Sequence, residues 1–180
     1  MLFRSVRDKL PAFQNGNYTP ASNAERLALA GWCQIKKLYH TATRLSAAAF
    51  AADPRLADDL RAGHRYNAAC SAALAAAGQG EDAAGLGEKG RRELRRQALT
   101  WLRADLAARR RQLKSWWPGQ AAQARQALTH WQQDSDLAGL RDQAALARLP
   151  AEERAACERL WADVAATLKK ADAPTKEGKP

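Results

Sequence analysis

The chain has 180 residues and a mass of 19.7 kDa, the size of one domain that can bury a core without disulfides or metal. Its hydrophobic share of 46%, charged share of 27% and mean hydropathy of −0.55 exclude an intrinsically disordered chain and a membrane-embedded one. The net charge of +10 makes polyanions, including nucleic acid, a class of partner to consider.

Alanine dominates the apolar residues, whereas the isoleucines and valines are limited to Ile35, Val6 and Val164. Alanine is the best helix former, and a sheet needs larger side chains on its pleated surface. The composition therefore predicts an all-α fold.

Apolar spacing along the chain predicts a series of helices with short connections. Residues 1–23 form a lead-in, residues 24–170 a helical domain and residues 171–180 a disordered tail. The third helix can break at Gly63, and a polar turn follows the fifth. The expected helices span residues 24–37, 38–52, 56–77, 88–116, 120–133, 143–148 and 150–170, with the turn at 134–142.

The sequence contains no signature of an enzyme, a metal site or a bound cofactor. The histidines His40, His64 and His130 lack metal-binding spacing, and no nucleophile lies in a local catalytic motif. The three cysteines are far apart, which favours reduced and buried thiols over a disulfide framework. Neither a secretory signal nor an apolar run of bilayer length is present, so we expect a cytoplasmic protein with no membrane span.

Residues 29–54 match the 34-residue tetratricopeptide pattern. Small side chains let two antiparallel helices approach closely, and an Asp-Pro turn ends the unit. The matching positions are Leu29, Ala30, Tyr39, Ala42, Ala49 and Pro54. A second, distorted repeat begins at residues 65–67. The pattern predicts a tetratricopeptide-like stack of antiparallel helix pairs, completed by a C-terminal helical cap.

Residues 15–170 resemble the helical C-terminal region of large bacterial serine/threonine protein kinases that carry tetratricopeptide arrays. The segments RYNAAC, residues 65–70, and WLRADL, residues 101–106, carry much of this resemblance. The chain has no glycine-rich phosphate loop and no HRD or DFG motif, so the resemblance implies no kinase activity here. It implies a scaffold or interaction segment whose partner is a protein or peptide, such as a kinase or a kinase substrate.

Two groups of residues are candidates for partner binding. The first is Arg65, Tyr66 and Asn67, which would line the groove between stacked first helices. Asn67 stands where tetratricopeptide domains that bind peptide termini carry a clamp asparagine, but Leu27 and Gly31 of the first repeat are not clamp residues. A complete carboxylate clamp is therefore not expected.

The second group is a row of arginines on the helix around residues 88–116. Residues 88–114 contain ten basic residues and three acidic ones. Helical periodicity places an apolar face on the opposite side of this helix from the arginines. These arginines could bind an acidic protein or, as an alternative, nucleic acid or another polyanion. They could also form a solvated face, and the whole chain could pack on a kinase or propeller domain. The arginines are Arg92, Arg96, Arg103 and Arg110.

Overall fold

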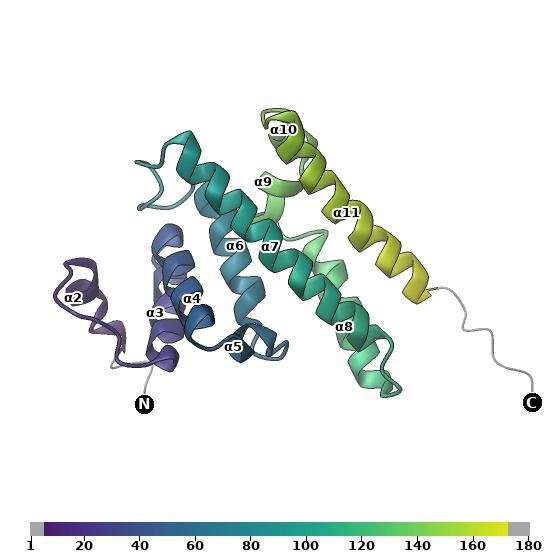
Figure 1. Ribbon diagram of the computed structural model, residues 1–180, viewed down its shortest axis with the longest axis horizontal. Helices are drawn as coiled ribbons and strands as arrows, with labels where there is room; N and C mark the ends of the chain where they lie inside the picture. The colour runs from purple at the N-terminus through teal and green to yellow at the C-terminus, as the bar shows by residue number, and fades with distance from the viewer. Residues whose placement is uncertain (1–5, 173–180) are drawn as a thin grey trace, which may run out of the picture. The chain divides into compact units, whose positions relative to one another are not determined.

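The computed structural model describes residues 6–172, and this part of the chain is helical with no strand (Figure 1). The all-α prediction is confirmed. The chain forms two compact units, Met1–Asp105 and Leu106–Pro180. The division falls inside the longest helix, α7 (Glu88–Leu113), a place that neither composition nor turn residues mark.

The first unit contains two longer helix pairs preceded by a short helix. Helix α4 contacts both α3 and α6, and α2 packs on α3. The third expected helix, over residues 56–77, is divided in two: the first part ends before Asp59, which is extended, and the second begins after Gly63, which adopts a φ of +66°. The elements are α2 (Leu10–Gln14), α3 (Asn23–Ile35), α4 (Tyr39–Ala52), α5 (Arg55–Asp58), α6 (His64–Ala76) and the first part of α7.

The second unit contains two longer helices joined by three short elements. Helix α11 contacts both α8 and α9. The predicted polar turn over residues 134–142 is wrong in part, because a 3-10 turn and a short helix occupy it. The elements are α8 (Pro118–Trp131), η1 (Ser135–Leu137), α9 (Ala138–Arg141), α10 (Gln143–Leu146) and α11 (Ala151–Asp172).

The ends of the chain depart from the predicted boundaries. The lead-in contains helix α2, and α11 continues to Asp172, two residues into the predicted disordered tail. The rest of that tail, residues 173–180, lies outside the described residues. Among the described helices, none has the length and apolar character needed to cross a bilayer.

The core of the first unit forms where α3 and α4 meet the lead-in. Ser22 begins α3 by accepting a hydrogen bond from the Glu25 N–H at 3.2 Å. Small side chains lie between the helices, which allows the close approach that the repeat pattern predicts. The buried cluster is Val6, Leu10, Ala28, Leu29, Ala30, Cys33, Leu38, Ala42 and Leu45.

A buried carboxylate attaches the lead-in to α3. Glu25 Oε1 lies 2.6 Å from Lys9 Nζ, and Oε2 accepts a hydrogen bond from the Ala21 N–H at 2.7 Å. Lys9 also lies 3.0 Å from the Tyr18 hydroxyl. Hydrogen bonds with Lys9, then with Tyr18 and Ala21, lower the pKa of Glu25 from 4.5 to about 2.

This shift predicts acid sensitivity in a defined pH window. Because the folded pKa of Glu25 lies below its ordinary value, its stabilising effect is complete above pH 4.5 and is lost as the pH falls toward 2. In the Glu25→Gln variant the melting temperature should be lower at neutral pH and should change less between pH 4.5 and 2. Thermal melts across this range check the prediction, and identical pH profiles for both proteins would contradict it.

The loop between α6 and α7 closes the α3–α4 turn. The Asp82 carboxylate accepts hydrogen bonds from the backbone N–H groups of His40 at 3.2 Å and Thr41 at 2.7 Å, which caps the start of α4. The Glu81 N–H donates to the Lys37 carbonyl at 2.9 Å. Gly80 adopts a φ of +96°, and a Cβ there would lie 2.5 Å from the Lys37 carbonyl oxygen.

Gly80→Ala should therefore destabilise the protein by about 1–3 kcal/mol, because the residue can neither adopt its φ freely nor clear the carbonyl. Gly85 in the same loop is the matched control, since a Cβ there would meet no atom within 4 Å. Urea denaturation of both alanine variants tests this, and equal stabilities would contradict it.

The core of the second unit lies where α8, α9 and α11 meet. The Trp161 indole N–H donates to the Leu140 carbonyl at 2.7 Å, which fastens α11 to α9. Arg141 donates to the carbonyls of Trp131 and Asp134 at 3.1 and 2.8 Å. The fully buried side chains here are Leu128, Trp131, Leu137, Leu140, Cys157, Leu160 and Val164.

Candidate interaction surfaces

The predicted groove residues belong to α6 and have different environments. Asn67 is exposed, Tyr66 is half-buried and Arg65 is buried. Gln34 of α3 reaches α6, where its amide nitrogen donates to the Asn67 carbonyl at 2.9 Å and the Ser71 hydroxyl at 2.8 Å. The side of the unit that carries Asn67 therefore combines residues from two successive first helices of the expected repeats.

Arg65 is not available to a partner at this surface. Only 6% of the residue is exposed, and its guanidinium makes ion pairs with Asp58 at 2.8 Å and with Asp105 of α7 at 3.4 Å. The prediction of Arg65 as a partner-binding residue is therefore replaced by a structural role. It connects α6 to α7 inside the unit.

Three of the four predicted arginines lie on the exposed side of α7 in the first unit. Arg92, Arg96 and Arg103 are exposed. At 100° per residue they fall within about 40° of one another around the helix. The predicted apolar face is confirmed as buried, and its residues are Leu94, Ala98, Trp101, Leu102 and Leu106. An acidic ligand at this row would meet guanidinium groups spaced one and two turns apart.

Arg110, the fourth predicted arginine, belongs to the second unit and already has acceptors there. Its Nη2 lies 3.0 Å from an Asp163 carboxylate oxygen, and its Nε donates to the Thr167 hydroxyl at 2.9 Å. It lines a hollow of about 550 Å³ between the C-terminal ends of α7 and α11. The hollow is lined by Arg110, Leu113, Lys114, Asp163, Ala166, Thr167, Lys170 and Ala171.

The tryptophans divide between the interior and one exposed turn. The apolar pattern predicts Trp32, Trp101, Trp131 and Trp161 as core residues. Trp101 and Trp131 are buried, whereas Trp32 and Trp161 are half-buried. Trp116 and Trp117, in the connection from α7 to α8, are both exposed, at 86% and 54%. The proline that begins α8 favours the extended backbone of Trp117, the residue before it.

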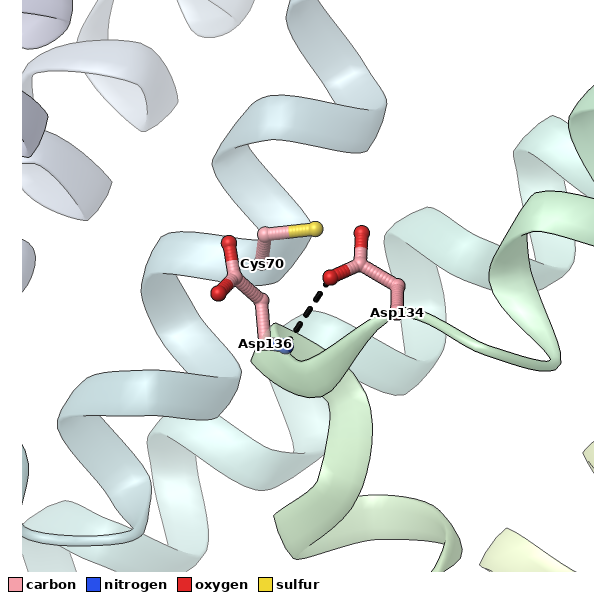
Figure 2. A group of neighbouring side chains, drawn as sticks. All are labelled: Cys70, Asp134 and Asp136. Atoms are coloured by element: carbon pink, nitrogen blue, oxygen red, sulfur yellow. Dashed lines mark hydrogen bonds between the residues drawn. The ribbon is translucent and has the colours of Figure 1, made fainter.

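Two aspartates in the second unit have a structural explanation. Asp134 begins η1, and its carboxylate accepts a hydrogen bond from the Asp136 N–H at 2.9 Å (Figure 2). Burial, and then the nearby Asp134 charge, raise the pKa of Asp136. The third residue drawn in Figure 2, Cys70, belongs to the first unit, and the three residues carry no proposed metal site.

The three cysteines are buried thiols, as predicted. Burial is the main cause that raises the pKa of the Cys33 thiol to about 12, so this group is a poor nucleophile at neutral pH. The surfaces that can contact a partner are therefore the Asn67 side of the first unit, the arginine row and the exposed tryptophan turn. No family model, curated protein or solved structure matches the chain.

Proposed function

We propose that the chain is a non-catalytic protein-interaction domain of tetratricopeptide type. The observation that supports this proposal is the pair of hydrogen bonds from the Gln34 side chain to α6, which connect α3 and α6, the first helices of the two expected pairs. In a tetratricopeptide stack those helices line the groove that receives a peptide or partner helix. Tyr66 and Asn67 stand beside these hydrogen bonds and are the residues we assign to partner contact.

The packing of the first unit supports the same proposal. Helix α6 buries ten of its thirteen residues, eight of them in the alanine-rich run from Ala69 to Ala76. Phe50 of α4 meets Trp101 of α7 edge to face, with ring centroids 5.7 Å apart. Small side chains thus occupy the central helix and large ones fill the outer gaps, which is how stacked helix pairs bury a continuous core.

A photo-crosslinking residue at position 67 tests the proposal directly. We expect a discrete crosslinked protein from position 67 and none from position 48, an exposed alanine on α4. A separate Tyr66→Ala variant should bind the crosslinked partner about tenfold more weakly, because a partly buried aromatic side chain is a typical interface anchor. Equal crosslinking from both positions, or an unchanged affinity, would count against a groove on this side.

The kinase resemblance adds a proposal about context. We propose that this domain serves a bacterial serine/threonine kinase, in the cytoplasm, where the buried thiols stay reduced. The intact mass of the native protein in its source cells tests this. A species of 19.7 kDa, the mass of this chain, indicates a freestanding adaptor, whereas a species several-fold larger indicates a segment of a kinase.

A second candidate function is polyanion binding through the arginine row of α7. Arg92, Arg96 and Arg103 favour it because they share one exposed stripe of a single helix. Binding of single-stranded oligonucleotides at increasing salt discriminates the two candidates. A log–log slope of about −2 that falls toward zero in the triple Gln variant would support the row. A salt-independent affinity would exclude it.

A further inference from the structure

The connection from α7 to α8 exposes two adjacent tryptophans. Their ring centroids lie 5.3 Å apart at an interplanar angle of 86°. Among the described residues, the exposed large hydrophobic side chains are these two and Ile35. The turn lies at the end of both helices (Figure 1), so its side chains can meet a surface without any change in helix packing.

The charged residues in the chain around this turn are all basic. Residues 106–133 contain five arginines or lysines and no acidic residue. Arg111 and Lys114, just before the tryptophans, are exposed. Lys114 and Lys170 also line the neighbouring hollow, whose one carboxylate, that of Asp163, is paired with Arg110. The surface therefore combines aromatic side chains with unneutralised positive charge.

We infer that this turn binds an anionic membrane surface. Tryptophan rings are apolar with one polar N–H, and they favour the headgroup region of a bilayer. Lysine and arginine beside them are attracted to the negative lipids of the cytoplasmic leaflet. Binding of this kind places the protein on the membrane, not across it.

The geometry favours a lipid surface over single-stranded nucleic acid. Successive bases stack on aromatic platforms along a cationic groove. Trp116 and Trp117 are nearly perpendicular to each other, so they cannot offer two parallel faces to neighbouring bases. The inference concerns the second unit and does not depend on the groove proposed for the first.

Vesicle sedimentation tests the inference with the full chain. We expect binding to phosphatidylcholine vesicles that contain phosphatidylserine and little binding to phosphatidylcholine alone. Arg111→Gln with Lys114→Gln should weaken partitioning by about thirtyfold, since two cations near the surface are lost. Trp116→Ala with Trp117→Ala should weaken it by about tenfold or more, and a blue shift of tryptophan fluorescence should accompany binding only while these rings are present.

Two control variants distinguish binding at this turn from the non-specific effects of net charge and of exposed apolar surface. Lys36→Gln with Arg44→Gln removes the same charge from exposed positions of the first unit, and Ile35→Ala removes an exposed apolar side chain elsewhere. Both should bind anionic vesicles as the parent protein does. Absence of vesicle binding, or equal loss in the two variants that each remove two positive charges, would overturn the inference. So would loss of oligonucleotide binding, with vesicle binding unchanged, in the Trp116→Ala, Trp117→Ala protein.

Discussion

Replacing Asp105 with alanine is expected to destabilise the protein by about 3–5 kcal/mol, the cost of removing the buried partner of the Arg65 guanidinium. The Asp105 side chain is 3% exposed and that of Arg65 is 8% exposed, so water cannot replace the lost carboxylate. The Nη2 atom of Arg65 already has no hydrogen-bond partner among the described residues. Its remaining ion pair would be the one with Asp58, which is 67% exposed.

Asp58→Ala is the matched control, because it removes the exposed partner of the same guanidinium and should cost about 1 kcal/mol or less. The double variant Arg65→Met, Asp105→Leu should recover much of the lost stability, since it removes the charge together with its partner. Urea denaturation monitored by circular dichroism measures the stability of all three variants. Equal losses for Asp105→Ala and Asp58→Ala would show that the buried pair is not the stronger one.

The second large effect is expected at Leu29, whose truncation to alanine should cost about 2–5 kcal/mol. Leu29 is fully buried in the cluster between the lead-in, α3 and α4, so its loss removes apolar contacts and leaves a cavity. Ile35→Ala on the same helix removes a similar volume from a side chain that is 62% exposed. That variant should stay within about 0.5 kcal/mol of the parent protein.

Denaturation of the two variants side by side keeps the contribution of helix propensity small, because Leu and Ile differ in propensity by less than about 0.7 kcal/mol. A similar loss at both positions would mean that the α3 core is not arranged as described. A large loss at position 29 alone would fix which face of α3 packs inward.

The same two residues show what the sequence could predict and what it could not. The repeat pattern placed Leu29, and helical spacing placed Ile35, in one apolar helix, and that helix exists. Spacing alone could not show that α3 ends at Ile35, where no later element covers the side chain. In α7 the longer pattern was sufficient, since every residue of the predicted apolar face is buried.

Long-range pairing explains the errors at the candidate sites. The sequence around Arg65 does not indicate that its ion-pair partner, Asp105, lies forty residues later. Arg65 was therefore predicted to lie on the surface and bind a partner. Helix periodicity, by contrast, was enough to predict that Arg92, Arg96 and Arg103 are exposed. The turn at residues 134–142 was mistaken because polar residues there cap short helical elements instead of interrupting them.

The positions of the buried cysteines have a consequence for how the chain opens. Cys33 lies in the core of the first unit and Cys157 in that of the second, and each is almost completely inaccessible. A thiol reagent can modify either one only when the surrounding structure opens transiently. In a Cys70→Ala protein, the two modification rates are therefore separate clocks for the two units. Matching rates would mean that the units open together, and different rates would mean that each opens by itself.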